Sequence, residues 1–273
     1  MPEPIRNLSL SAIVQALRDG SLSAVELTQS CIDSHDASLN AYREWTPDLA
    51  LEHARAADAA FANAQDSGSL QGIPVSVKDL YGVNDTQTFA GSPAPMPPPW
   101  QTEGDLISGL RAQQAVFPGK THTVEFAFGG LGINSHWGTP RNPWDANTHR
   151  VPGGSSSGAG VSLCEGSALV ALGSDTAGSV RIPASVTGNV GLKTSYGRWP
   201  VSGIFPLSPT LDTAGVLTRS VADAVTAFSA MDPHQRSYGP RLAREVSRCT
   251  PADFVIGTGE RALWDDCDPG ISE

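Results

Sequence analysis

Three consecutive serines, residues 155–157, lie in the glycine-rich stretch GGSSSGAG. A serine hydroxyl can attack a substrate when a neighbouring base accepts its proton. None of the six histidines lies in the serine- and glycine-rich stretches, and no two have HExxH spacing. Lysine can be the base when burial lowers the pKa of its amine by several units from about 10.4. Lys78 ends the alternating segment GIPVSVK and is the lysine to test, although a strand-end lysine alone is more often a solvated edge residue.

The serine run has other interpretations. A flexible linker is disfavoured because the run continues directly into the apolar segment AGVSL and a buried strand. A phosphate-binding loop is disfavoured because neither GxxxxGK[ST] nor GxGxxG is present. Residues 154–158 match G-x-S-x-G, the nucleophile motif of serine esterases, with Ser156 at its centre. That motif should follow a strand and precede a histidine, but DANTHRVPG is polar and His234 is the one histidine downstream. The esterase interpretation stays open as a lesser alternative.

Bulk composition excludes several function classes. The chain has 273 residues, 40% hydrophobic and 17% charged, which is enough for a sizeable core. A net charge of −10 and a pI of about 5.0 argue against a nucleic-acid or anionic-membrane surface. No apolar run approaches the roughly 20 residues of a membrane span, and MPEPIRNLSLS has no signal-peptide segment. Four cysteines without CxxC spacing predict reduced thiols in a cytoplasmic protein, with neither a zinc site nor a disulfide framework: Cys31, Cys164, Cys249 and Cys267.

Helices and strands must bring the reactive side chains together. Apolar residues at helical spacing from 10 to 17 predict a first helix that Gly20 ends, and SAVE at 23–26 has capping-box spacing. Alternation over 73–78 predicts a strand, and the continuous apolar segment 167–175 predicts a strand buried on both faces. Strands alternating with helices indicate an α/β sheet. Further helices are predicted at 48–64, 104–114 and 220–231, and a short strand at 115–118.

Three motifs, in this order, resemble those of the amidase signature family: GIPVSVKDLYGV, GTPRNPWDANTHRVPGGSSSGAGVSLCEG and ALGSDTAGSVRIPASVTGNVGLKTSYGR. That family includes bacterial amidases and the A subunit of the glutamyl-tRNA amidotransferase. The resemblance runs from about residue 8 to the end of the chain. It implies an α/β fold with a mixed central β-sheet, helices on both faces and an N-terminal helical segment. It also implies a single domain over 1–273, with a helical region at 1–65 and a catalytic core at 66–273.

The resemblance implies a catalytic triad of two serines and a lysine. By position in the motifs, the lysine is Lys78, the bridging serine after a cis peptide bond is Ser155, and the nucleophile is Ser179 in TAGSVRIP. Ser179 would attack an amide carbonyl and pass its proton through Ser155 to a neutral Lys78. The lysine would return the proton to the leaving nitrogen. This implies an amidohydrolase that forms an acyl-enzyme and needs no metal or cofactor.

The resemblance assigns three further sets of residues. Backbone N–H groups before the nucleophile form an oxyanion hole, a glycine-containing loop lines the acyl pocket, and two charged residues brace the turn. Lys120 also matches a family position, but we interpret it as structural because Lys78 already supplies the base. Ser156 and Ser157 are expected to donate hydrogen bonds or cap the following helix. The three sets are Thr176, Ala177 and Gly178; Phe128, Gly129 and Gly130; and Asp175 and Arg181.

Two departures from the family keep alternatives open. Ala177 stands where the family usually has glycine, and a positive φ there would strain alanine and misdirect an N–H group. Family members also continue well past this length, so the C-terminal part of the fold is expected to be missing. The sequence therefore predicts an amidohydrolase for a small-molecule amide, with homo-oligomerisation or a partner chain to complete the sheet. The alternatives are an A-type subunit that releases ammonia from glutamine for a tRNA-binding partner, and a non-catalytic fragment.

Overall fold

The computed structural model describes residues 8–234 and 248–255. Contacts divide the chain into two compact units, residues 1–235 and 236–273, whereas the sequence predicts one domain. In the second unit, the described part holds a 3-10 helix, Pro251–Asp253, which Thr250 and Asp253 cap through a capping box. The sheet, the α-helices and the candidate site described below all belong to the first unit.

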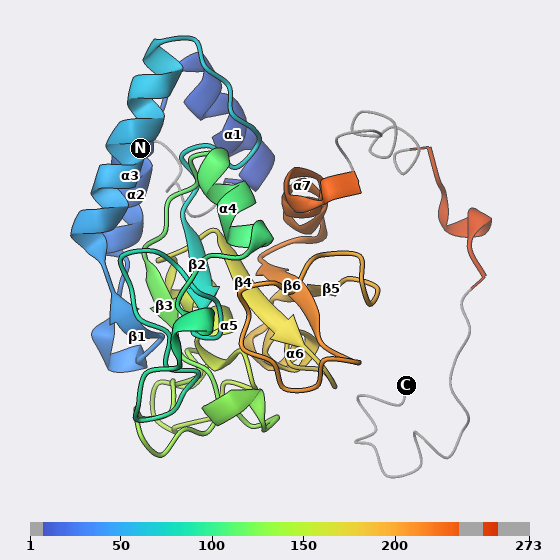
Figure 1. The fold of residues 1–273 in the computed structure, drawn as a ribbon. Coiled ribbons are helices and arrows are strands. Elements are labelled where there is room, and N and C mark those ends of the chain that lie inside the picture. The colour runs from blue at the N-terminus through green and yellow to red at the C-terminus, as the bar shows by residue number, and fades with distance from the viewer. Residues whose placement is uncertain (1–7, 235–247, 256–273) are drawn as a thin grey trace. The chain divides into compact units, whose positions relative to one another are not determined.

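A six-stranded mixed sheet forms the centre of the first unit (Figure 1). The strand order is β1-β3-β2-β4-β6-β5, so neighbours in the sheet come from distant parts of the chain. Strand β2 is parallel to both β3 and β4, and the three remaining pairs are antiparallel. The strands are β1 Tyr42–Trp45, β2 Val75–Lys78, β3 Gly119–Thr121, β4 Val170–Asp175, β5 Val190–Lys193 and β6 Thr213–Thr218.

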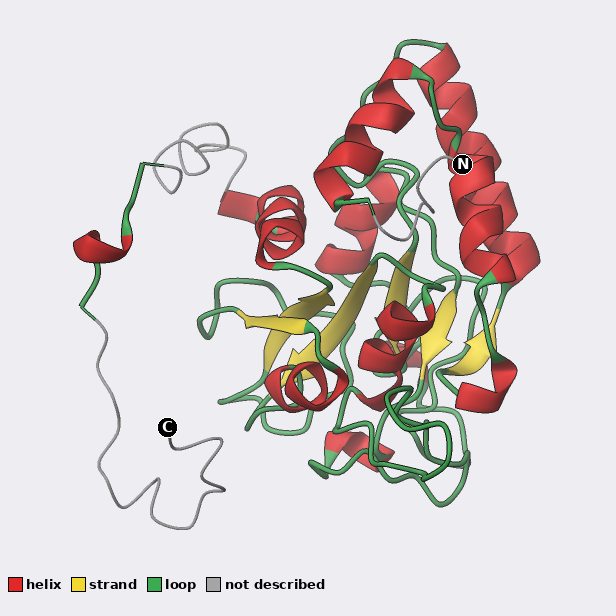
Figure 2. Cartoon of the chain, turned by 180° about the vertical axis from the view of Figure 1, so that it is seen from behind, coloured by secondary structure: helices red, strands yellow, loops and turns green. Residues whose placement is uncertain are grey.

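Helices cover both faces of this sheet, as the sequence predicts. Helices α5 and α6 lie in front of the strands in Figure 2 and behind them in Figure 1. The α-helices are α1 Leu10–Asp19, α2 Ala24–Asp33, α3 Pro47–Ala62, α4 Asp105–Ala112, α5 Ser157–Glu165, α6 Arg181–Thr187 and α7 Val221–Met231. Short 3-10 helices span Ala37–Leu39, Pro98–Trp100 and Glu125–Ala127.

Alternating residues of the central strands pack in two different clusters of the core. Leu172 of β4 and Val216 of β6 pack in the larger cluster, together with apolar residues of α1, α4 and α7. Their neighbours Ala171 and Leu217 pack in a smaller cluster with residues of α5 and α6. Because successive side chains of a strand point to opposite faces, a strand buried on both faces is apolar along most of its length. This explains the uninterrupted apolar run that predicts β4.

The predicted local signals mostly form as expected. Helix α1 ends at Gly20 with a φ of 75°, and Ser23 and Glu26 make the predicted capping box of α2. The strand predicted at 115–118 is wrong in position, because β3 is Gly119–Thr121 and Val116 makes only an isolated bridge to Pro74. Sequence analysis does not identify β1, β5 or β6. These strands are short or rich in small residues, and their pairing with distant strands determines their conformation.

Close backbone approach explains the glycine at position 158 of α5. A Cβ atom at Gly158 would lie 2.0 Å from the carbonyl oxygen of Ala41 and 2.6 Å from the amide nitrogen of His122. Both are backbone atoms, so no side-chain rotation can relieve the overlap. Glycine at this position therefore allows α5 to pack directly against the backbone just before β1 and just after β3.

Replacing Gly158 with alanine should destabilise the protein by several kcal/mol, in the range of severe overpacking. Gly109 of α4 is the matched control, since a Cβ there meets nothing within 4 Å. Gly109→Ala should stabilise by about 0.5–1 kcal/mol through helix propensity. Chemical denaturation of both variants measures the difference. Equal unfolding free energies for the two variants would contradict the packing of α5 described above.

Candidate active site

The candidate site lies where two parallel central strands end. Strand β2 ends at Lys78 and β4 ends at Asp175. Val77 pairs with Leu172 in the register of these strands, which brings Lys78 beside the last residues of β4. The carboxyl ends of parallel strands are a common place for ligand sites in α/β folds.

Lys78 is completely buried, and its amine makes two short hydrogen bonds. Nζ donates to Ser155 Oγ at 2.7 Å and to Ser174 Oγ at 2.9 Å. Ser155 is also completely buried. The structure therefore joins two members of the predicted triad directly, although they are far apart in the sequence.

Burial has a large effect on the protonation of Lys78. Removal of the amine from water lowers its pKa from 10.5 to about 7, although the negative charges of Asp175 and Asp212 partly oppose this shift. The amine forms no ion pair with any described carboxylate. A neutral fraction is thus substantial near neutral pH, and such an amine can accept a proton.

The backbone around Ser155 has the conformation that the resemblance implies. The peptide bond between Gly154 and Ser155 is cis. Gly154 donates its N–H to the carbonyl of Gly130 at 2.8 Å, and Val124 donates its N–H to the carbonyl of Ser155 at 3.1 Å. Two parts of the loop that precedes the serines therefore hold the backbone on each side of the cis bond.

Ser179 lies beside the serine run. Its carbonyl accepts a hydrogen bond from the N–H of Ser156 at 3.2 Å, and the residue is half-buried. Its hydroxyl makes no hydrogen bond to Ser155 or to any other described residue. The backbone contact places the two segments next to each other, while Ser179 keeps a side chain that is partly accessible.

Asp175 organises the turn between β4 and Ser179. Its carboxylate accepts the N–H groups of Gly178 at 2.8 Å and Val180 at 3.1 Å, and pairs with the guanidinium of Arg181 at 2.9 and 3.0 Å. Burial would raise the pKa of Asp175, but the hydrogen bonds from Arg181 and from these two N–H groups hold it below the usual value. The carboxylate therefore stays ionised and holds the backbone of the turn through these hydrogen bonds.

The predicted oxyanion donors differ in their availability. The N–H of Gly178 is occupied by Asp175, so this prediction conflicts with the hydrogen bonding of the turn. The N–H groups of Thr176 and Ala177 make no hydrogen bond to any described residue. Ala177 is not among the described non-glycine residues with positive φ, whereas Gly178 has a φ of 127°. The alanine is therefore unstrained, and glycine is required at the next position instead.

The loop of residues 128–130, predicted to line the acyl pocket, lies near the serine run and the turn before Ser179. A Cβ atom added at Gly154 would be 2.7 Å from the carbonyl oxygen of Gly129, and one added at Gly130 would be 3.5 Å from Ile182. Ile182 in turn lies against Gly178. Phe128 is 80% exposed and extends away from the packed core. The loop thus flanks the serine run, with its aromatic side chain on the surface.

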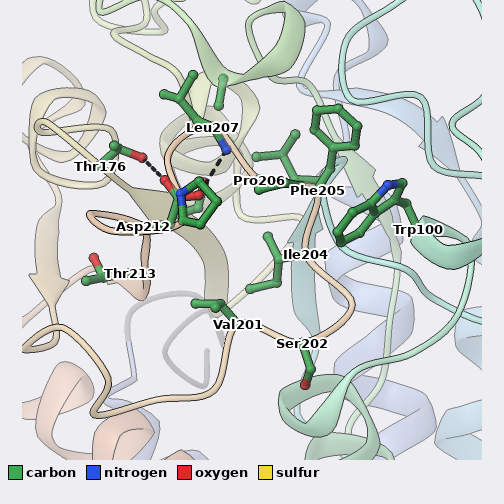
Figure 3. Close-up of a pocket in the computed structure, with 14 residues that line it drawn as sticks. Trp100, Thr176, Val201, Ser202, Ile204, Phe205, Pro206, Leu207, Asp212 and Thr213 are labelled. Carbon is green, nitrogen blue, oxygen red and sulfur yellow. Dashed lines mark hydrogen bonds between the residues drawn. The ribbon is translucent and has the colours of Figure 1, made fainter.

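A pocket of about 310 Å³ opens beside the same strand ends (Figure 3). It reaches Ser174, the hydrogen-bond partner of Lys78, and Thr176 of the candidate oxyanion turn. Most of its wall is apolar or aromatic, and Trp100 and Phe205 contact each other edge to face with ring centres 5.7 Å apart. The apolar lining residues are Leu80, Trp100, Ala127, Val201, Ile204, Phe205, Pro206, Leu207 and Pro209.

Two residues of this region were not identified from the sequence. Ser174 holds the Lys78 amine, and its position at the end of the predicted strand, before Asp175, was the one available signal. Asp212 belongs to no recognised motif and accepts a hydrogen bond from Thr176 Oγ1 at 2.6 Å. Residues such as Ser174 and Asp212 are found through their contacts with distant segments, which the amino-acid composition does not show.

Lys120, by contrast with Lys78, is held in a buried ion pair. Its amine is buried, lies 3.1 Å from Asp79 Oδ1, and donates to Thr88 Oγ1 at 3.1 Å. Burial lowers the pKa of Lys120, although the Asp79 charge partly opposes this. An amine in an ion pair is a poor proton acceptor, which distinguishes Lys120 from Lys78.

The hydroxyls of the two remaining serines of the run have no hydrogen bond to a described amine or imidazole that could accept their protons. Ser156 is buried and donates its hydroxyl to the carbonyl of Ser174 at 3.4 Å, and it makes no side-chain cap of α5. The hydroxyl of Ser157 is buried and has no partner among the described residues. No described histidine side chain is hydrogen-bonded to Ser156, so the esterase interpretation lacks its base.

Neither a metal-binding cluster nor a membrane-spanning helix is found in the described ranges, 8–234 and 248–255. Within them, no group of three or more histidine, cysteine, aspartate or glutamate residues is arranged to hold a metal ion. None of the helices found there combines the length and hydropathy needed to cross a membrane.

Fold and site together define an α/β protein with a buried lysine–serine pair at the carboxyl edge of a mixed sheet. The amidase family model matches residues 23–273, and the chain belongs to the amidase family. Solved structures agree: a crystal structure of an amidase matches with a TM-score of 0.77 and 37% identity, over 82% of this chain and 51% of the other. The native peptide amidase of Stenotrophomonas maltophilia matches with a TM-score of 0.76 and 30% identity, over 88% and 50%.

Curated relatives include two kinds of enzyme. The chain is 52% identical to 2-amino-5-chloromuconic acid deaminase of Comamonas testosteroni over 269 residues, which are 97% of this chain and 57% of the relative. It is 40% identical to the A subunit of glutamyl-tRNA(Gln) amidotransferase from Cereibacter sphaeroides (strain KD131) over 262 residues, which are 95% and 51%. The chain spans about half the length of the curated relatives it matches.

Replacing Lys78 with methionine tests the burial of the amine through stability. In the unfolded chain the amine is protonated up to about pH 10.5, but in the folded protein only up to about pH 7. Between these values folding releases a proton, so the parent should gain stability relative to Lys78→Met as pH rises from about 7 to 10. The whole gain is on the order of 5 kcal/mol. Denaturation of both proteins across this pH range measures it, and a pH-independent difference would place the amine in water.

Proposed function

We propose that this protein is an amidohydrolase that cleaves a carboxylic amide C–N bond of a small molecule through Ser179, Ser155 and Lys78. The observation that carries the proposal is the 2.7 Å hydrogen bond from the completely buried Lys78 amine to Ser155 Oγ. Membership of the amidase family and the similarity to solved amidases support it. We also propose that the protein works in the cytoplasm.

In the first half-reaction, Ser179 Oγ attacks the amide carbonyl carbon. Its proton passes to Ser155 Oγ as Ser155 gives its own proton to the neutral Lys78 amine. The negative charge that forms on the carbonyl oxygen is stabilised by the free N–H groups of Thr176 and Ala177. One such donor is typically worth about 10²–10³ in rate.

The relay then runs in reverse. Lys78 returns its proton through Ser155 to the leaving nitrogen, the C–N bond breaks, and the acyl group remains on Ser179. Water, deprotonated by the same relay, hydrolyses the acyl-enzyme and releases the carboxylic acid. Ser174 keeps the lysine aimed at Ser155, because its hydroxyl accepts the second hydrogen bond of the amine.

Labelling with a fluorophosphonate tests the nucleophile and the base together. The probe should phosphonylate Ser179, and the labelling rate should rise as pH increases through about 7, where Lys78 loses its proton. Ser179→Ala should abolish labelling, and Ser155→Ala and Lys78→Met should each lower the rate by at least about 10²-fold. Mass spectrometry of the labelled chain identifies the serine.

Ser156→Ala is the control for the adjacent serine. It should still be labelled, because Ser156 lies outside the proposed relay. Labelling at Ser156 in the parent, or loss of labelling only in Ser156→Ala, would favour the esterase interpretation. A parent chain that takes up no probe at any pH would instead support a non-catalytic role.

A second candidate function is that of an A-type subunit in a tRNA-dependent amidotransferase. The 40% identity to the Cereibacter sphaeroides protein favours it. In that case glutamine is the amide and a partner chain receives the ammonia. The acidic net charge of −10 is compatible with this role only if the partner binds the tRNA.

Ammonia release separates the two functions. The purified chain should release ammonia faster from at least one simple amide, such as acetamide, benzamide or malonamide, than from glutamine. A rate with glutamine at least tenfold above every other amide would overturn the preferred function in favour of the amidotransferase role.

A further inference from the structure

Asp212 connects two segments that are distant in the sequence. It lies in the loop before β6, and its Oδ1 accepts the hydroxyl of Thr176, in the turn after β4, at 2.6 Å. Figure 3 shows the two side chains meeting at the edge of the pocket. Thr176 has one of the two free backbone N–H groups of the candidate oxyanion turn. The contact therefore fixes a residue that is three positions before Ser179.

The same carboxylate holds the wall of the pocket. It accepts the N–H of Leu207 at 2.9 Å and the N–H of Ser208 at 3.0 Å, while the N–H of Asp212 donates back to the carbonyl of Ser208 at 2.8 Å. Leu207 and its neighbour Phe205 line the pocket. One side chain thus makes hydrogen bonds both to this wall and to the turn.

We propose that Asp212 is a positioning residue, which aligns the oxyanion turn with the pocket wall by holding Thr176 Oγ1 and the backbone of residues 207–208 with a single carboxylate. The inference rests on the proposed function. A substrate group seated against Phe205 and Leu207 then has its carbonyl oxygen placed for the N–H groups of Thr176 and Ala177.

The charge of Asp212 also acts on the base. Asp175 and Asp212 are the two charged groups whose fields oppose the effect of burial on the Lys78 amine. Asp175 also pairs with Arg181, whereas no described lysine, arginine or histidine forms an ion pair with Asp212. Removal of the Asp212 charge should therefore lower the pKa of Lys78 further below about 7.

Two variants separate position from charge. Thr176→Val removes the hydroxyl and keeps both the side-chain shape and the Asp212 charge. Its fluorophosphonate labelling rate should fall about tenfold, with an unchanged midpoint on the pH axis. Asp212→Asn should lose at least as much rate, and its midpoint should move to lower pH. A leucine at position 212 leaves no acceptor for the Thr176 hydroxyl, so the double variant Thr176→Val with Asp212→Leu should be no slower than Asp212→Leu alone.

NMR of labelled lysine measures the effect of the Asp212 charge on the pKa of Lys78 without any catalytic turnover. The sequence contains three lysines, Lys78, Lys120 and Lys193, so ¹³Cε-labelled lysine produces few signals and replacement variants can assign them. The Lys78 signal should titrate near pH 7 in the parent and at a lower pH in Asp212→Asn. Asp33→Asn is the matched control, since it removes one exposed carboxylate of α2 and should leave both the rate and the titration unchanged.

Three results would overturn the proposal: parent-like labelling of Asp212→Asn, single-variant losses that add in the double variant, or an unchanged Lys78 titration in Asp212→Asn. If Asp212→Asn does not fold, which thermal melting would show, Thr176→Val decides alone. A parent-like rate in that variant then overturns the proposal. Failure of the proposed function is distinguishable, because it appears as an unlabelled parent, in which the NMR titration is still measurable.

Discussion

The hydrogen bond between the buried amine of Lys78 and the hydroxyl of Ser155 is the constraint on which the site depends. An ammonium group in this place would lose its hydration and gain no close carboxylate, so burial favours the neutral amine. In the part of the chain that the structure describes, the same burial restricts the hydrogen-bond partners of Nζ to Ser155 and Ser174. Burial is therefore the common cause of the low pKa of the Lys78 amine and of its orientation toward Ser155.

That constraint explains several features of the surrounding fold. A lysine can be buried here because it ends a strand in the middle of the sheet, with β3 on one side and β4 on the other. Helix α5 must come close to deliver Ser155, and Gly158 permits this by leaving room for the backbone of Ala41. Carboxylates are present nearby, but Asp175 forms its ion pair with Arg181 and not with the amine.

Lys120 shows what a different environment does to a similar residue. Lys78 ends β2, and Lys120 lies in the neighbouring parallel strand β3. Lys78 is completely buried and Lys120 almost completely. Lys120 has Asp79 at 3.1 Å, and this charge stabilises its ammonium form. Among the described residues, only serine oxygens lie within hydrogen-bond distance of the Lys78 amine. Two residues of one type thus acquire a structural and a candidate catalytic role from their partners alone.

The local elements and the candidate triad could be predicted from the amino-acid sequence. Helical spacing and capping residues are short-range signals, so α1 and α2 could be predicted, and the uninterrupted apolar run predicted β4. The three ordered motifs identified the family and therefore pointed to Lys78, Ser155 and Ser179. The roles of these residues remain predictions, whereas the family and the α/β fold are established.

The partners of those residues, by contrast, depend on packing in three dimensions. The pKa of Lys78 depends on complete burial, and burial results from packing of segments that are distant in the chain. Ser174, Asp212, the pocket and strands β1, β5 and β6 likewise depend on long-range contacts, which leave no periodic pattern in the sequence. Periodicity and capping report a residue's near neighbours along the chain, but electrostatics depends on neighbours in space.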